Sequence, residues 1–563
     1  MATPAIRPLA PGLALVCLLG TGVTAQAPEE SADLQQFGAA VEVRVVNVDV
    51  HVTDKQGNPV TGLGPEDFEL FEDRRPVAIS NFYAVEDGRP DAGAAAEAEA
   101  RPAAEAPPTA PTVAEELPPE QQLHMVVYVD NLNLRPFNRN RVLRSLRTFL
   151  DQHLAPGDRA MVVSYERSLH VRQPFTSDSG ALSRALLELE TLSAQGVHAD
   201  SDRRDVLRDI QERDDLSFAE SRVRAYAESQ YNDLQFTIDA LKDFVRHLGG
   251  LPGRKALVYV SDGVPMRPGE DLYYALNQSS QQQVSLLEVQ RFDASRRFDE
   301  LASMAASDRV AFYALEATGL RVPSSASALE REPGAGPLID SVYISNMQAP
   351  LQLLAEKTGG QAVLNTNNMD PALDRIAREL RTYYSLGYQP ARPQDGRYHR
   401  IEVKVKDKGL RVRHRQGYRD ETVESQMEQA VMAGLMFGRN DNPLAVRLEI
   451  GRPERREDGN YQVPLQVLLP LSNLTLVPQA GERTGRVRLF LAVMDTRGDS
   501  TPVHQVPIPI HIKEERWEAV QAAAYPYEIP LTMAPGEQRL AIGIRDEIGA
   551  AESFIVQTVT PGS

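Results

Sequence analysis

Two short apolar runs that each end at an acidic residue place the strongest limit on what this chain can fold into. The runs are Met125–Val129, followed by Asp130, and Ala256–Val260, followed by Ser261 and Asp262. An apolar run this short, bounded by polar residues, is typical of a strand buried on both faces of a parallel sheet. Because open α/β sheets bind their ligands at the carboxyl ends of such strands, both acids stand where a site is expected.

The segment around these runs alternates strand patterns with amphipathic helix patterns. One helix is predicted over residues 138–153, where Val142 and Leu146 fall on the same face. A repeating β-α order requires right-handed crossovers and a mainly parallel sheet. We therefore predict a doubly wound α/β domain over 122–390, with a charged, solvated helical insertion near 200–232.

All-β patterns flank this domain on both sides. Residues 40–87 predict a small β-sandwich module, and residues 382–420 predict a β extension. Strands that recur at short spacing over residues 440–560 favour a C-terminal β-sandwich. Residues 88–121 are rich in Ala, Pro and Glu, which cannot build a core, so we expect a spacer there.

Two turns in the flanking regions share one pattern. Val52-Thr-Asp-Lys-Gln-Gly57 and Val493-Met-Asp-Thr-Arg-Gly498 each place an Asp three residues before a Gly at a strand end. Turn chemistry and kinship between the two β modules explain this equally well.

The N-terminal segment predicts export. Arg7, an apolar stretch over residues 9–19 and small residues up to Ala25 are typical of a secretory signal over residues 1–25. The single cysteine, Cys17, lies inside that signal. No later apolar run approaches the roughly 20 residues that span a bilayer. We therefore expect an exported protein, periplasmic or extracellular after cleavage, with no membrane span.

Charge and motifs narrow the classes of function. A net charge of −18 argues against nucleic acid and anionic membranes as partners, since both require a basic face. The sequence contains neither a His-Glu-x-x-His nor a Gly-x-Ser-x-Gly motif, and its closest histidines, His504 and His511, are seven residues apart. We therefore expect a protein that is not an enzyme.

Taken together, the motifs resemble the exported bacterial proteins related to the von Willebrand factor A domain, of the acidobacterial type. The resemblance covers about residues 41 to 420. The matching residues are Val52-Thr-Asp54 with Gly57 and Pro59-Val60, Gly62-Leu63, Asp67-Phe68 with Glu72-Asp73, Tyr128-Val-Asp-Asn-Leu-Asn133, Leu154-Ala-Pro-Gly-Asp-Arg159, Val260-Ser-Asp-Gly263, and Tyr384-Ser-Leu-Gly-Tyr388 with Gly417-Tyr418.

That resemblance implies a doubly wound α/β fold with a metal-ion-dependent adhesion site at the carboxyl edge of its sheet. The family pattern is Asp-x-Ser-x-Ser after the first strand, a Thr from a later loop and an Asp after the fourth strand. Asp130 matches the first acid and Asp262 the last, but Leu132 and Leu134 occupy the two serine positions. No Gly-Thr stands where the threonine is expected. The resemblance therefore implies a degenerate metal site.

Two interpretations of these acids stay open. Asp130 and Asp262, helped by a carbonyl oxygen of Asn131 or Asn133, would bind Mg²⁺ or Ca²⁺ weakly. Alternatively, both acids accept backbone N–H groups and cap the loops or helices that follow them.

The expected function is protein–protein interaction or adhesion at this edge, with a protein as the partner. The loops that would contact the partner contain Asn131, Asn133, Arg135, Gly263 and Arg267. Two other classes stay open. An exported hydrolase or carbohydrate-active enzyme would require a pair of carboxylates at one site. A structural protein would assemble envelope complexes through its terminal sandwiches.

Overall fold

The computed structural model describes residues 45–86, 88–90, 122–212, 216–279, 287–321, 336–390 and 395–562. The chain divides into two compact units, one spanning Arg44–Glu421 and one containing Thr422–Ser563. The predicted signal and nearly all of the predicted spacer lie outside the described residues. None of the described helices combines the length and the apolar character needed to cross a membrane.

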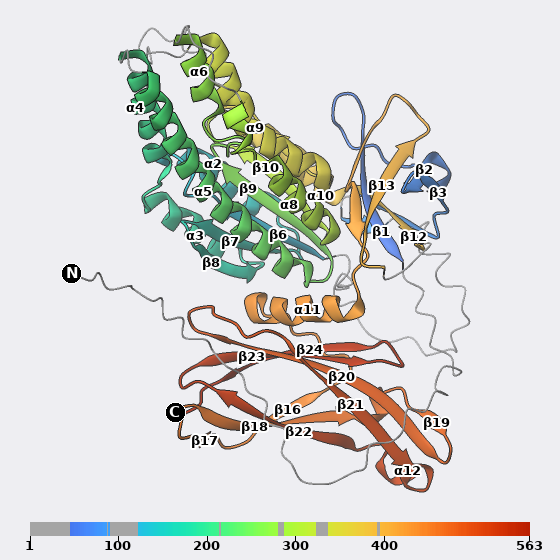
Figure 1. Cartoon of the computed structure of the whole chain (residues 1–563). Coiled ribbons are helices and arrows are strands. Elements are labelled where there is room, and N and C mark those ends of the chain that lie inside the picture. Colours follow the sequence, from blue (N-terminus) through green and yellow to red (C-terminus); the bar gives the residue numbers. More distant parts are fainter. Residues whose placement is uncertain are drawn as a thin grey trace, which may run out of the picture. The chain divides into compact units, whose positions relative to one another are not determined.

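A six-stranded sheet with the order β11-β10-β9-β6-β7-β8 forms the centre of the first unit (Figure 1). The strands are β6 (Leu123–Val129), β7 (Arg159–Tyr165), β8 (Leu169–Thr176), β9 (Arg254–Ser261), β10 (Val310–Glu316) and β11 (Gln361–Val363). All neighbours run parallel except β8, which pairs with β7 in the antiparallel sense. The predicted mainly parallel α/β sheet is confirmed. Strand β8 was not predicted, because as a polar edge strand with no fully buried residue it lacks an apolar run.

Helices cover both faces of this sheet. The helices are α2 (Pro136–His153), α3 (Ser179–Thr191), α4 (Gly196–Glu212), α5 (Leu216–Gly249), α6 (Glu270–Ser279), α7 (Leu287–Gln290), α8 (Ser295–Ser307), α9 (Pro337–Thr358) and α10 (Asp370–Arg381). Helices α2, α3 and α10 share one core with Met125, Val127 and Val129 of β6. On the other face Tyr128 contacts Phe244 of α5, with ring centroids 5.7 Å apart. Cover on both faces explains why every residue of β6 and β9 is buried.

The predicted insertion near residues 200–232 is helical and consists of α4 and the first half of α5. It is not only a solvated charged region, because it has an apolar core of its own. Val206 and Leu207 of α4 pack there with Val223 of α5 and Leu272 of α6. The sequence obscured this core because each apolar residue stands among charged neighbours.

The predicted module at 40–87 and the predicted extension at 382–420 form one β-sandwich. Its strands are β1 (Val46–Thr53), β2 (Phe68–Glu72), β3 (Arg75–Val77), β4 (Asn81–Glu86), β5 (Arg89–Pro90), β12 (Tyr383–Tyr388), β13 (Tyr398–Val405), β14 (Arg411–His414) and β15 (Gly417–Arg419), with a 3₁₀ turn, η1, at Pro65–Asp67. One sheet has the order β14-β1-β12-β4-β5 and the other β15-β13-β2-β3. The α/β domain is therefore inserted between the two halves of this sandwich.

Strand β1 has one apolar and one polar face. Val48 and Val50 lie in the core between the two sheets, whereas Asp49 and His51 lie on the opposite face. Those two polar side chains line a cavity at the starts of strands β9 and β10. The period-two alternation of β1 thus decides which of its residues reach the α/β domain.

The described part of the second unit consists of two β-sheets and two α-helices, in the region where the sequence predicts a C-terminal β-sandwich. It contains α11 (Val423–Phe437), β16 (Arg447–Ile450), β17 (Glu454–Arg455), β18 (Tyr461–Pro470), η3 (Leu471–Asn473), β19 (Val477–Gln479), β20 (Glu482–Asp495), β21 (His504–Lys513), α12 (Glu514–Val520), β22 (Ala524–Met533), β23 (Gln538–Asp546) and β24 (Glu552–Val559). Strands β16, β17, β18 and β22 form one sheet, and β19, β20, β21, β23 and β24 form the other. Helix α11 packs on the second sheet, where Val431 and Leu435 join Phe490 and Phe554.

Candidate functional site

The candidate site lies at the carboxyl ends of β6 and β9, which are neighbours in the sheet. The chain continues from β6 to β7 on one side, and β9 lies on the other side, so the strand order reverses between β6 and β9. Open α/β sheets bind ligands at such a switch point. Asp130 follows β6 and Asp262 follows β9, so both predicted acids lie there.

Asp130 is fully buried and hydrogen-bonded by the protein itself. Its Oδ2 accepts hydrogen bonds from the Tyr259 hydroxyl at 2.6 Å, the Asn133 amide at 2.9 Å and the Ser261 hydroxyl at 3.1 Å. Burial raises its pKa, while these hydrogen bonds act to lower it. The carboxylate therefore holds the loop after β6 in place, and it does not face solvent.

Asn131, the residue after Asp130, is fully buried as well, and its side chain is hydrogen-bonded to the buried guanidinium group of Arg139. Its side-chain oxygen accepts a hydrogen bond from Arg139 at 2.6 Å, and its amide donates to the Ser193 carbonyl at 2.9 Å. Arg139 also donates to the carbonyl of Leu192. Asn131 therefore joins the loop to α2 and to the segment after α3, and it cannot contact a partner.

Asp262 caps the N-terminus of α2. Its Oδ2 accepts the backbone N–H of Arg135 at 3.0 Å, and the Asn138 amide donates to both of its oxygens at 3.0 Å. Burial raises its pKa to about 6, against the lowering effect of these hydrogen bonds. A carboxylate at this position also interacts favourably with the positive end of the helix dipole. The helix that Asp262 caps precedes it in the chain, whereas the sequence interpretation had the acid capping the loop or helix that follows it.

The residues present do not fit a divalent cation. Mg²⁺ and Ca²⁺ are bound by several oxygen atoms at once, but the oxygens of both carboxylates already accept hydrogen bonds from neighbouring N–H and O–H groups. The leucines at the two serine positions add no oxygen, and the side-chain oxygen of Asn131 is bound to Arg139. Among the described residues, no three His, Cys, Asp or Glu side chains are placed to hold a metal ion.

Two further predicted contact residues lie on the loop after β9. Gly263 has a φ of +111°, and a Cβ there would meet the Met347 carbonyl oxygen at 2.9 Å, so only glycine fits. Arg267 lies beyond the pocket and pairs with Asp293 at 2.9 Å and Glu270 at 3.3 Å. Arg267 therefore fastens the loop to neighbouring segments.

Several residues that the sequence did not single out complete the edge. Thr318 and Arg321, on the loop after β10, both donate to the Asp262 carbonyl, at 3.1 and 3.0 Å. With Asn133, Arg135 and Asp262 they line a pocket that α9 closes on one side. The sequence does contain a signal for these residues, because both follow closely after β10, a third strand that ends at this edge.

Three large apolar side chains are exposed in the segments that supply residues of this pocket, although none of the three lines it. Phe137 is 75% exposed, Leu320 61% and Val197 46%. Phe137 stands between Arg135 and Asn138, which both bind Asp262. Leu320 precedes Arg321, and Val197 follows Gly196, whose N–H donates to the Leu134 carbonyl at 3.0 Å. The segments that supply the polar pocket therefore also carry exposed apolar side chains.

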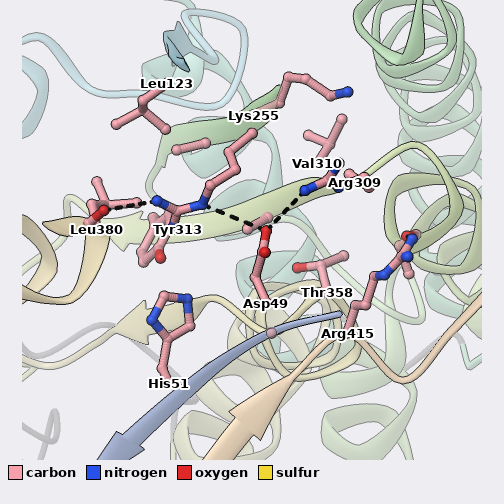
Figure 2. A pocket seen from close by; sticks show the side chains of 15 residues that line it. Asp49, His51, Leu123, Lys255, Arg309, Val310, Tyr313, Thr358, Leu380 and Arg415 are labelled. Carbon is pink, nitrogen blue, oxygen red and sulfur yellow. Dashed lines mark hydrogen bonds and ion pairs between the residues drawn. The ribbon is translucent and has the colours of Figure 1, made fainter. Parts of the chain in front are cut away.

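The opposite edge of the sheet carries the β-sandwich (Figure 2). Arg254 begins β9 and Arg309 precedes β10, and both approach Asp49 Oδ2, at 3.5 and 3.4 Å. Burial would raise the pKa of Asp49, but the charges of Arg309 and Arg254 outweigh it and lower the pKa. The charged group of β1 is thus held by the amino ends of two adjacent strands.

No family model matches the chain, and no curated protein matches it. Three of the solved structures that match are an aerotolerance-related membrane protein from Bacteroides fragilis (13% identity, TM-score 0.23), the conserved hypothetical protein BatB from Bacteroides thetaiotaomicron (12%, 0.22) and the pilus adhesin SpaC from Lactobacillus rhamnosus GG (8%, 0.27). They cover 46%, 46% and 90% of this chain and 98%, 97% and 57% of their own. Values this low establish neither a shared fold nor a shared function. Membership of the von Willebrand factor A family therefore stays a prediction.

Proposed function

We propose that this chain is an exported, non-enzymatic interaction protein that binds a partner protein at the carboxyl edge of its α/β sheet. The observation that carries this proposal is that three exposed apolar side chains, Phe137, Val197 and Leu320, belong to the segments that also supply residues of one polar pocket. Partners bury such exposed apolar side chains at the centre of protein interfaces, with polar groups around them. A partner that buries the aromatic ring of Phe137 would gain the most binding energy there.

The chemistry of the edge supports binding rather than catalysis. Asp130 and Asp262 are buried, and each is held by donors that fix its loop. A general acid or base has to reach the proton that it transfers, and neither carboxylate presents a free oxygen to solvent in this arrangement. Hydrogen bonds that hold both predicted acids in their loops support a role for this edge in binding.

Substitution of two of these exposed apolar side chains tests the proposal. The double variant Phe137→Ser/Leu320→Ser removes two exposed side chains that make no contribution to the core. We expect it to fold like the wild type and to lose at least tenfold in affinity for the partner, since hot-spot residues contribute about 2 kcal/mol or more. The measurement is pull-down from cell-envelope extract, followed by titration of the purified partner.

Phe236→Ser is the matched control. Phe236 is 66% exposed and lies near the middle of α5, six residues beyond Gln230, the last residue of that helix that lines the pocket. A partner that is retained by Phe236→Ser and lost by the double variant supports the edge as the interface. Equal recovery of every partner by the wild type, the double variant and Phe236→Ser would show that the partner does not bind at the carboxyl edge.

A further inference from the structure

A small cavity lies where the β-sandwich meets the amino edge of the sheet (Figure 2). Its volume is about 40 Å³, and its lining comes from β1, from the starts of β9 and β10, and from Arg415 between β14 and β15. Since one water needs roughly 10–15 Å³ by the same measure, the space suits one small ion with its water.

The lining of this cavity is strongly basic. Four cationic side chains line it, Arg254, Lys255, Arg309 and Arg415, against one carboxylate, Asp49. Asp49 approaches Arg254 and Arg309 through the same oxygen, Oδ2. One carboxylate therefore serves two guanidinium groups, and the lining as a whole carries an excess of positive charge.

Arg415 is the guanidinium group of the lining that forms no ion pair with this carboxylate. Its guanidinium donates only to backbone carbonyls in its hydrogen bonds, to Ala306 at 2.9 Å, Ser307 at 3.4 Å and Asn47 at 2.7 Å. Its buried Nε has no hydrogen-bond partner. Burial and the nearby charge of Arg309 lower the pKa of Arg415 to about 10, which reflects the cost of holding this charge here.

The acids near the cavity also interact with other groups. Glu379 forms its own ion pair with Arg413. Burial and the nearby Glu421 raise the pKa of Asp308, whereas the charges of Lys255 and Arg415 lower it. Of the three guanidinium groups that line the cavity, Asp49 pairs with two, Arg254 and Arg309, and forms no ion pair with Arg415.

A second buried donor completes the cavity. His51 is 6% exposed, and its buried Nδ1 has no hydrogen-bond partner. Burial lowers the pKa of His51 to about 4, so near neutral pH the ring is uncharged and this nitrogen donates a hydrogen bond in one of the two tautomers. The unpartnered Oδ1 of Asp49 is an acceptor and repels an anion, so an anion fits toward Arg415 and away from Asp49.

From the cavity, its basic lining and these unpartnered buried donors, we infer a binding site for one small inorganic anion, of the size of chloride or of a tetrahedral oxyanion. The anion joins Arg415 to the residues at the starts of β9 and β10. Its binding stabilises the junction between the β-sandwich and the α/β domain.

Thermal unfolding of the full chain in different sodium salts tests this site. Chloride, sulfate and phosphate are compared with gluconate, which is too large for the cavity, at equal ionic strength. We expect at least one of the three small anions to raise the Tm of the first unit by about 2–5 °C in a saturable manner. Arg415→Gln abolishes this rise, whereas Arg296→Gln, at a residue whose side chain is 92% exposed, leaves it unchanged.

A saturable rise in the wild type that is lost in Arg415→Gln supports the site. An equal rise in Arg415→Gln, or no saturable rise with any of the three anions, overturns it. Where Arg415→Gln does not fold, Arg309→Gln takes its place, because Arg309 lines the same cavity and its side chain is 25% exposed. The same two outcomes then decide.

Discussion

At the scale of single residues, Asp130 stands at the position of the first acid in the predicted adhesion-type metal site, but its carboxylate accepts hydrogen bonds from the protein. Tyr259 and Ser261 donate to Asp130 from the neighbouring strand, and Asn133 donates from the same loop. Hydroxyl and amide groups thus stabilise the carboxylate of Asp130 through hydrogen bonds, which is the role that a bound cation would have in a metal site. Because donors to a buried carboxylate are costly to remove, the loop is rigid without a metal.

The hydrogen bond from Tyr259 to Asp130 makes a stability prediction. Tyr259→Phe removes a 2.6 Å bond to a buried carboxylate, and we expect it to destabilise the first unit by about 1.5–3 kcal/mol. The matched control is Tyr128→Phe on the adjacent strand, since the buried hydroxyl of Tyr128 has no partner. Removing that hydroxyl is expected to be neutral or stabilising. The measurement is urea unfolding of each variant, and equal losses in both would contradict the assigned role.

A second prediction concerns metal ions. Since the groups around Asp130 and Asp262 are donors, we expect Mg²⁺ or Ca²⁺ at millimolar concentration to leave the Tm within about 1 °C of its value with chelator. A bound ion at a hundredfold excess over its Kd would contribute about 2.7 kcal/mol, which is easily seen. The control is Asp262→Asn, which removes one candidate ligand. A saturable rise in the wild type that is absent in the variant would re-establish the metal site.

At the scale of elements, the two turns with a shared sequence pattern also share their hydrogen bonds. Asp54 Oδ1 accepts the N–H groups two and four residues later at 2.9 and 2.8 Å, and Asp495 Oδ1 does so at 2.8 and 3.0 Å. The glycines have φ angles of +87° and +92°. A short acid that binds its own turn and a glycine with positive φ produce this geometry by themselves. Kinship between the two modules stays open.

The elements that the sequence predicted best are those with one strong periodicity. Strands β6 and β9 were predicted because burial on both faces leaves an uninterrupted apolar run. Strand β8 was missed because its polar edge position leaves no such run. The pairing of β12 with β1 and β4 was missed for another reason, because it joins residues about 300 positions apart that no local pattern connects.

The candidate site was predicted in position and only partly in composition. The ends of β6 and β9 were placed at one edge by the rule for parallel strands, and they do lie there. The same rule applies to β10, yet Thr318 and Arg321 were not singled out, because no family motif marks that loop. The hydrogen bonds that occupy Asp130 depend on Tyr259, which alone reads as an ordinary apolar strand residue.

At the scale of the whole molecule, the first unit is organised by insertion. The β-sandwich is built from residues on both sides of the α/β domain, and β12 lies between β1 and β4. Every residue of β12 is buried. The chain therefore passes from the sandwich into the α/β domain and then returns to the same sandwich. The sandwich also places Asp49 at the amino edge of the α/β sheet. Neither part is complete in a single continuous segment.

This arrangement predicts that residues 45–90 cannot be removed. The deletion takes six buried side chains out of the sandwich core: Val46, Val48, Val50, Val52, Phe68 and Leu70. Each contributes about 1.5–3 kcal/mol, so the six together contribute about 9–18 kcal/mol, which is as large as the roughly 5–15 kcal/mol that stabilises a typical domain. It also leaves Arg254 and Arg309 without Asp49. We expect an insoluble or non-cooperatively unfolding product, measured by soluble yield and by circular dichroism during heating.

The control for this deletion is a chain that ends at Glu421, because this boundary separates the two compact units and cuts no sheet. We expect that chain to stay soluble and to unfold in one cooperative transition. If the chain lacking residues 45–90 instead unfolded as cooperatively as this control, the α/β domain would be stable without the sandwich. The insertion would then describe only the order of the segments along the chain and would not stabilise the α/β domain. The ion pair between Asp49 and the two arginines would also contribute little to stability.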